Sequence, residues 1–260
     1  MSKIRNKIEE VNNRNEKALS VFLTAGFPVG LDFVDLAVRV LDAGADMLEI
    51  GIPFSDPLAD GSVIQQSSQA VLEQGMTLER VLGFTKEIRE RTDKPLILMG
   101  YANPVYFYGV DSFLRDAESA GADGLIIPDV PLDEYDSFFG VGAVPLDTIL
   151  LTTPETSSAR IADIDRKSSG FVYCVSVSGT TGVRNGFSVE ELASLKRTRE
   201  LIHNNKMLTG FGISSPENVK QVVPYCDGVI VGSAVIRSLR LSGTDATLEL
   251  VGQLKRSCSY

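Results

Sequence analysis

Short apolar runs of strand length recur along the chain, and each is followed by a turn and an amphipathic stretch. Eight such runs are present: Leu19–Ala25, Met47–Ile50, Pro95–Gly100, Gly124–Ile127, Thr148–Leu151, Phe171–Val175, Met207–Gly210 and Gly228–Val231. The segments between them, such as Leu31–Leu41 and Val189–Leu201, place apolar residues at the period of about 3.6 that is typical of helices. The pattern therefore predicts eight alternating strand–helix units.

The strands of such a protein are expected to pair in parallel, because their runs are apolar throughout and must be covered on both faces. Eight units of this kind close into a barrel rather than an open sheet. No linker or low-complexity segment interrupts the 260 residues. We therefore predict an α/β fold, a single (β/α)8 TIM barrel domain over residues 1–260, with an extra N-terminal helix in Met1–Glu16 that plugs the barrel bottom and a last helix at Thr244–Arg256.

Three joints between helix and strand resemble one another. Asp42–Asp46 and Ser119–Asp123 share the order Ala-Gly-Ala-Asp, and Tyr225–Gly228 is a related turn before the last strand. Each is typical of a joint in which a helix ends, a glycine adopts the left-handed region, and a small residue then leads into a buried strand. The repetition supports a series of equivalent units.

Charge and composition narrow the class of protein. The net charge of -9 argues against nucleic acid and anionic membranes as partners, and no apolar run approaches the roughly 18 residues of a membrane span. The three cysteines lack metal-site spacing, so we expect reduced thiols in a cytoplasmic protein. His203 is the sole histidine and lies in a polar joint, which disfavours a metal site and a Ser–His triad.

Two carboxylates in the run Leu48–Gly61 are the strongest candidates for chemistry. Glu49 lies inside a strand-like apolar run, where an acid is costly to bury without a partner or a task. No Lys or Arg occurs between residues 48 and 76, although a distant ion-pair partner remains an alternative. Asp60 follows on a Gly- and Pro-rich loop and could instead cap the helix that begins near Ser62. One acid on a strand and one on a loop suit a proton-transfer pair.

Glycines at the ends of the last strands predict a phosphate site. Gly212 follows the seventh strand, Gly232 and Ser233 follow the eighth, and Gly182 lies after the sixth. Glycine allows the backbone N–H groups to approach an anion, and these loops often bind phosphate in such barrels. Simple tight turns are the alternative for each glycine taken alone.

The Leu48–Gly61 run resembles the signature of the tryptophan synthase alpha subunit family. Supporting motifs are Tyr101–Pro104, Asp129–Pro131, Ser178–Gly182, Gly210–Ser214 and Gly232–Ala234, and the resemblance covers nearly all of residues 1–258. It implies a (β/α)8 lyase that cleaves indole-3-glycerol phosphate to indole and glyceraldehyde 3-phosphate without a cofactor. It also implies a pyridoxal-phosphate beta subunit as partner, in a linear alpha2-beta2 complex that receives the indole.

The resemblance further implies roles for particular residues. Glu49 resembles the general acid/base, Asp60 the acid that pairs with the indole N–H, and Tyr173 a hydroxyl that assists. The phosphate-binding positions are Gly182, Phe211, Gly212, Gly232 and Ser233. The substrate pocket is expected to include Phe22, Met99, Tyr101, Ile127 and Thr181. The partner interface is expected to include Asp56, Pro57, Asn103 and Pro131.

Two other functions remain as alternatives. The first is a different phosphate-binding barrel, such as indole-3-glycerol phosphate synthase, which should carry a catalytic Lys at a strand end; none of the eight predicted strand ends has one. The second is an alpha-like subunit that binds and regulates with little turnover of its own.

Overall fold

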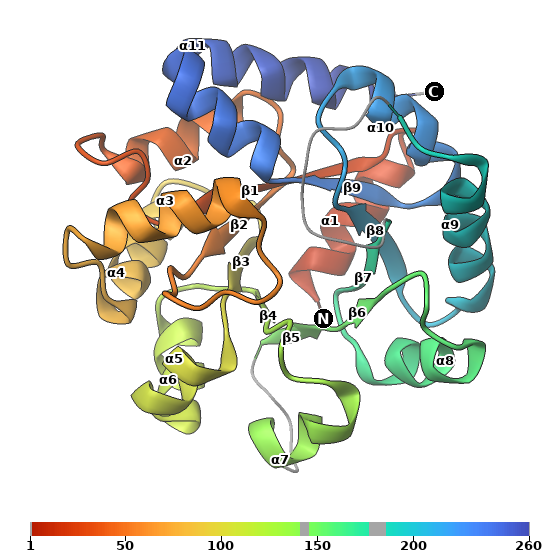
Figure 1. Cartoon of the computed structure of the whole chain (residues 1–260), viewed down its shortest axis with the longest axis horizontal. Coiled ribbons are helices and arrows are strands. Elements are labelled where there is room, and N and C mark those ends of the chain that lie inside the picture. The colour runs from red at the N-terminus through yellow and green to blue at the C-terminus, as the bar shows by residue number, and fades with distance from the viewer. Residues whose placement is uncertain (1, 141–145, 177–185, 260) are drawn as a thin grey trace.

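A closed parallel barrel surrounded by helices forms the body of the molecule (Figure 1). The computed structural model describes residues 2–140, 146–176 and 186–259. The strands are β1 (Ala18–Thr24), β2 (Met47–Gly51), β3 (Leu96–Met99), β4 (Gly124–Ile126), β5 (Asp147–Ile149), β6 (Leu151–Thr152), β7 (Phe171–Val175), β8 (Lys206–Gly210) and β9 (Gly228–Val231). They follow the order β5-β4-β3-β2-β1-β9-β8-β7-β6.

The predicted fifth strand is divided into β5 and β6. Only Leu150 separates them, and its carbonyl accepts a hydrogen bond from the backbone N–H of Tyr173 on β7 at 3.0 Å. β5 pairs with β4 and β6 pairs with β7, so the chain itself closes the ring. The eight predicted strand positions and the barrel are confirmed.

Helices follow the strands and cover the outside of the barrel (Figure 1). They are α1 (Lys3–Asn12), α2 (Phe33–Asp42), α3 (Ser62–Leu72), α4 (Leu78–Arg89), α5 (Ala102–Tyr108), α6 (Val110–Ser119), α7 (Tyr135–Phe139), α8 (Ser158–Lys167), α9 (Val189–Leu201), α10 (Pro216–Val222) and α11 (Ser233–Arg256), with 3-10 turns η1 (Leu132–Glu134) and η2 (Val223–Tyr225). The predicted last helix is the second half of α11, which bends at Gly243. Among the described helices, none is both long and apolar enough to cross a membrane.

The extra N-terminal helix closes one end of the barrel, as predicted. Ser2 caps α1 by accepting a hydrogen bond from the N–H of Arg5, and the side chains of Ile4, Ile8 and Val11 are fully buried. They pack against the inward-facing residues of the strands. The N-terminal ends of the strands are therefore sealed, and any site must lie at the opposite end.

Side chains of each strand alternate between the barrel interior and the layer under the helices. On β2, Met47 belongs to the interior cluster, whereas Leu48 and Ile50 pack outward against the helices. Glu49 is two residues after Met47, so its carboxylate enters the barrel interior near its C-terminal end.

Candidate active site

A cavity at the C-terminal ends of the strands collects most of the predicted site residues. Its lining consists of Phe22, Glu49, Asp60, Ile64, Met99, Tyr173, Phe211, Gly212, Ile213, Ile230, Gly232 and Ser233. The acids from β2 and its loop therefore share one cavity with the glycines that follow β8 and β9. The volume of this cavity is about 30 Å³.

Glu49 is buried in this cavity with a neutral partner. Its side chain is 1% exposed, and its Oε1 accepts a hydrogen bond from the hydroxyl of Ser20 at 2.7 Å. Burial raises the pKa of the carboxyl to about 7, and the Ser20 hydroxyl opposes that rise. No described Lys, Arg or His lines the cavity. The ion-pair alternative for Glu49 therefore finds no support among the described residues, and the carboxyl can exchange a proton near neutral pH.

Asp60 lies beside Glu49 in the cavity, on the loop that leads into α3. Burial raises the pKa of its carboxyl to about 6, and a hydrogen bond from Tyr101 opposes the rise. The N-cap of α3 is Gly61, without a side-chain capping bond, so the capping alternative for Asp60 is wrong. The Tyr101 hydroxyl also accepts the N–H of Ala59 at 3.1 Å. Tyr101 thus fixes the loop and the acid rather than lining the cavity itself.

Tyr173 presents a protonated phenol to the same cavity. Its side chain is 4% exposed, and burial followed by the charges of Glu49 and Asp60 raises its pKa well above the ordinary value. Its ring meets that of Phe211 edge to face, with centroids 6.0 Å apart. The hydroxyl can therefore donate a hydrogen bond but not act as a base.

The turn after β8 has the backbone geometry of an anion cradle. Phe211 and Gly212 both have positive φ, 69° and 75°. The hydroxyl of Ser176 holds this turn by donating to the carbonyls of Gly210 and Phe211, at 2.6 and 2.5 Å. Two successive residues in this region turn backbone N–H groups toward one point, which suits a phosphate.

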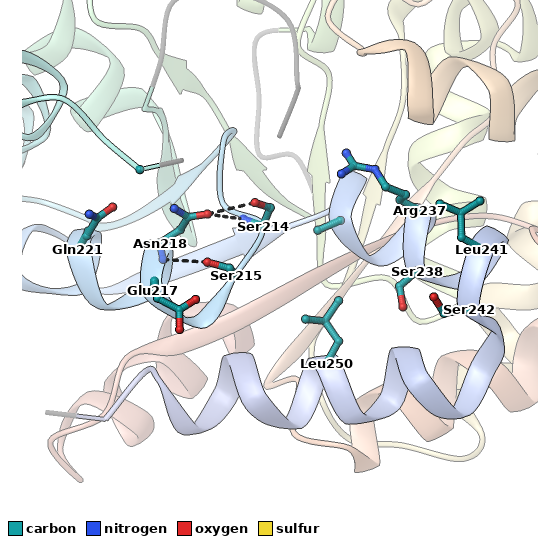
Figure 2. Close-up of a pocket in the computed structure, with 12 residues that line it drawn as sticks. Ser214, Ser215, Glu217, Asn218, Gln221, Arg237, Ser238, Leu241, Ser242 and Leu250 are labelled. Atoms are coloured by element: carbon teal, nitrogen blue, oxygen red, sulfur yellow. Dashed lines mark hydrogen bonds between the residues drawn. The ribbon is translucent and has the colours of Figure 1, made fainter. Parts of the chain in front are cut away.

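The far side of the same turn is tied to α10. Figure 2 shows Asn218 accepting hydrogen bonds through Oδ1 from the N–H and the hydroxyl of Ser214, each 3.1 Å long. The pocket drawn there has a volume of about 550 Å³ and contains none of the predicted site residues. These contacts brace the cradle from behind.

Gly232 and Ser233 complete the cradle at the start of α11. A Cβ on Gly232 would lie 3.2 Å from Cβ of Phe22, so a larger residue would press on the pocket wall. Gly232 is also the N-cap of α11, whose first turn points its N–H groups outward from the helix end. The helix dipole adds a favourable field for an anion at this position.

Several predicted residues lie outside the cavity. Ile127 is buried in the layer under the helices rather than in the barrel. Side chains alternate along the segment, so Leu125 and Ile127 point outward and Ile126 points inward. The prediction for Ile127 was wrong by one strand position. Thr181 and Gly182 lie outside the described residues.

The predicted partner surface stays a prediction, and three of its four residues are exposed in the structure. Asp56, Asn103 and Pro131 are exposed, whereas Pro57 is buried between two exposed neighbours in the sequence. Pro57 therefore offers no free surface in this chain. The sequence interpretation missed the large exposed apolar side chains nearby, Leu58, Tyr106 and Phe107, at 85%, 74% and 93% exposure. The adjacent aromatic residues Tyr106 and Phe107, in the short segment after the third strand, were the available signal.

Ser20 was also missed by the sequence interpretation. It lies in the middle of an apolar run, two residues before Phe22, so both side chains lie on the same face of the strand. A polar residue on the face of a predicted pocket residue was the available signal. The described residues contain no group of three or more His, Cys, Asp or Glu side chains able to hold a metal ion.

Comparisons with known proteins agree on one family. The family model described as tryptophan synthase alpha chain matches residues 8–257. The tryptophan synthase alpha chain of Christiangramia forsetii is 40% identical over 257 residues, covering 98% of this chain and 99% of that protein. That of Carboxydothermus hydrogenoformans is 43% identical over 237 residues, covering 91% and 88%.

Solved structures give the same result. The structure of Mycobacterium tuberculosis tryptophan synthase in space group F222 superposes with a TM-score of 0.91 at 32% identity, covering 100% of this chain and 99% of that chain. The tryptophan synthase subunit alpha of Legionella pneumophila str. Paris superposes with a TM-score of 0.87 at 33% identity, covering 99% and 98%.

Proposed function

The chain belongs to the tryptophan synthase alpha chain family, and we propose how its cavity carries out that family's lyase reaction on indole-3-glycerol phosphate. The observation that carries the proposal is the pair of buried acids, Glu49 and Asp60, which face a glycine cradle across one cavity without a cationic partner among the described lining residues. The products are indole and glyceraldehyde 3-phosphate.

Glu49 and Asp60 divide the proton transfers. Asp60, which is ionised above its pKa of about 6, takes the proton of the indole N–H. Protonated Glu49 donates a proton to C3 of the ring. The resulting Glu49 carboxylate then takes the proton of the hydroxyl on the adjoining glycerol carbon. The C–C bond breaks, the bonding electrons return to the ring, and protonated Asp60 gives the proton back to the ring nitrogen. A carboxyl with a pKa near 7 can act first as acid and then as base.

The phosphate and the ring are bound at opposite sides of the acids. We place the phosphate on the backbone N–H groups of Gly212, Gly232 and Ser233. The ring lies between Phe22, Met99 and Tyr173, with the Tyr173 hydroxyl as a donor. A cavity of about 30 Å³ is too small for this substrate, and a neighbouring cavity of about 590 Å³ shares Phe211 with it. We propose that the Phe211 side chain turns on binding and joins the two cavities.

The beta subunit binds at the mouth of this barrel. Leu58, Tyr106 and Phe107 expose large apolar surface there, beside the exposed polar Asp56 and Asn103. Such a patch is typical of a protein–protein interface. We propose that one alpha chain binds one beta subunit through this patch, in the linear alpha2-beta2 complex that the family resemblance implies.

We also propose that residues 1–260 act as one domain in the cytoplasm. The segment between α1 and β1 contacts the C-terminal segment, where the N–H of Lys17 donates to the carbonyl of Cys258 at 2.8 Å. All three cysteines are free and buried, which fits a reducing compartment.

An indole-release assay with indole-3-glycerol phosphate tests the function. We expect the purified chain to release indole slowly and a beta subunit to accelerate the release. Phe107→Asp should weaken beta-subunit binding by at least tenfold without changing the slow basal rate, because it places a charge in the apolar patch. Leu241→Asp is the matched control, since Leu241 is 69% exposed on α11. No indole release with or without the beta subunit would contradict the proposal.

A further inference from the structure

Ser20 contacts the proposed acid/base directly, although it lies in the interior of a strand. Its side chain is fully buried, and its hydroxyl donates to Oε1 of Glu49 over 2.7 Å. The two residues lie on the adjacent strands β1 and β2, where Ser20 pairs with Met47 and Phe22 pairs with Glu49. Strand pairing therefore fixes the donor relative to the carboxylate, and no loop movement is needed to form the bond.

This hydrogen bond is the one found for the Glu49 carboxylate among the described residues. The ionisable groups that face Glu49 are Asp60, from the loop before α3, and the phenol of Tyr173 on β7. Neither is among the causes of the shift in the Glu49 pKa, which are burial and the Ser20 hydroxyl. A hydroxyl that donates to the carboxylate is thus the single described contact that favours its ionised form.

The geometry also separates the two carboxylate oxygens. With Oε1 held by a fixed donor, Oε2 is the atom left to exchange protons with a substrate. A carboxyl that can rotate freely would present either oxygen, and misplacement of about 1 Å in a reacting group costs on the order of 100-fold in rate.

We propose that Ser20 is a positioning residue for Glu49, which holds Oε1 so that Oε2 transfers both protons and which sets the upper end of the active pH range. This inference rests on the proposed role of Glu49 in the lyase reaction. It differs from a purely structural role for Ser20, in which the hydroxyl would only satisfy its own hydrogen bond.

The test is Ser20→Ala in the full chain, with Ser67→Ala as the matched control. Ser67 is also a buried serine with a hydrogen-bonded hydroxyl, 2.7 Å from that of Thr24, but it does not touch Glu49. The titration of Glu49 is followed by carboxyl carbon NMR on glutamate-labelled protein and assigned by its loss in Glu49→Gln. The pH dependence of kcat and KM is measured on the same proteins, and thermal unfolding confirms that each is folded.

In Ser20→Ala we expect the Glu49 titration midpoint to rise by about one pH unit, because a donor to the charged form is lost. The alkaline limb of the kcat–pH profile should move to higher pH by the same amount. At the pH optimum, kcat should fall about tenfold and KM should change less than twofold. Ser67→Ala should leave all of these values unchanged. Ser20→Thr, which keeps the hydroxyl, should retain the wild-type midpoint.

An unchanged midpoint in Ser20→Ala would overturn the inference, as would an equal shift in Ser67→Ala or Ser20→Thr. The NMR titration needs no turnover, so it stays informative if the proposed function fails. Full activity of Glu49→Gln would contradict the proposed function, whereas an inactive Glu49→Gln with an unshifted Ser20→Ala would contradict only the role of Ser20.

Discussion

Buried and half-buried carboxylates lie at both ends of the barrel, and their surroundings differ. At the N-terminal ends of the strands, Asp46, Asp123 and Asp227 each accept a hydrogen bond from a backbone N–H at the start of the neighbouring strand, at 2.8 to 2.9 Å. Each also forms an ion pair with a Lys or Arg. These are the aspartates of the repeated joints seen in the sequence, and they connect adjacent βα units.

Asp165 extends the same arrangement beneath β8. Its two carboxylate oxygens accept backbone N–H bonds from His203, Asn204 and Asn205, between 2.8 and 3.0 Å long, and the side-chain amides of both asparagines add further donors. Each of these carboxylates therefore accepts at least one backbone hydrogen bond that holds the fold.

At the opposite end, Glu49 and Asp60 have one neutral donor each and no cation among the described lining residues. Burial without a compensating positive charge raises the pKa of both carboxyls toward neutrality, although one hydrogen bond opposes the rise in each. The same residue types are therefore paired with cations at one end of the barrel and left without them at the other, at a cost in stability that is expected where acids are kept for proton transfer.

Removal of the Glu49 carboxylate should have the largest effect on activity. We expect Glu49→Gln to lower kcat for indole release on the order of 1000-fold, because an amide cannot exchange the two protons. Binding of a glycerol phosphate analogue, measured by calorimetry, should change little. Asp46→Asn at the other end is the comparison, and wild-type turnover in Glu49→Gln would remove the distinction between the two ends.

Gly212→Asp should have the next largest effect. A side chain at φ 75° strains the cradle, and its charge repels a phosphate, so affinity for glycerol phosphate analogues should fall on the order of 100-fold. Gly75→Asp has nearly the same φ, 73°, in open space and controls for backbone strain. Equal affinities for the two variants would place the phosphate elsewhere.

The pH profile should show the smallest effect. The reaction needs ionised Asp60 and protonated Glu49 at the start, so kcat should fall below about pH 6 and above about pH 7. On each limb the rate should fall about tenfold per pH unit. The two apparent pKa values describe Glu49 and Asp60 together rather than either residue alone. A rate that is flat from pH 5 to 9 would contradict the assignment of these acids.

Much of the architecture could be predicted because it depends on local patterns. Apolar runs and the glycine joints located every strand position, and the unpaired acid in Leu48–Gly61 identified Glu49. Orientation was harder: the run Gly124–Ile127 does not say which residue points inward, so Ile127 was assigned to the wrong face. The Ser20–Glu49 bond depends on the register between β1 and β2, which no local pattern specifies.

The most direct test is the free energy of unfolding of two isosteric variants, Glu49→Gln and Asp165→Asn, at pH 5 and pH 8. The folded-state pKa of Glu49 is raised above its unfolded value of 4.5, so the folded protein binds more protons between pH 4.5 and 7 and loses stability as pH rises through that range. Relative to the wild type, Glu49→Gln should therefore gain about 3 kcal/mol between pH 5 and pH 8.

Asp165→Asn should instead lose about 3 kcal/mol at pH 8, because an amide NH2 would face backbone donors that lose their acceptor. At pH 8 the free energy of unfolding, relative to the wild type, should therefore increase in Glu49→Gln and decrease in Asp165→Asn. A loss of stability in Glu49→Gln as large as that in Asp165→Asn would contradict the account, because Glu49 would then be a structural acid like those at the other end.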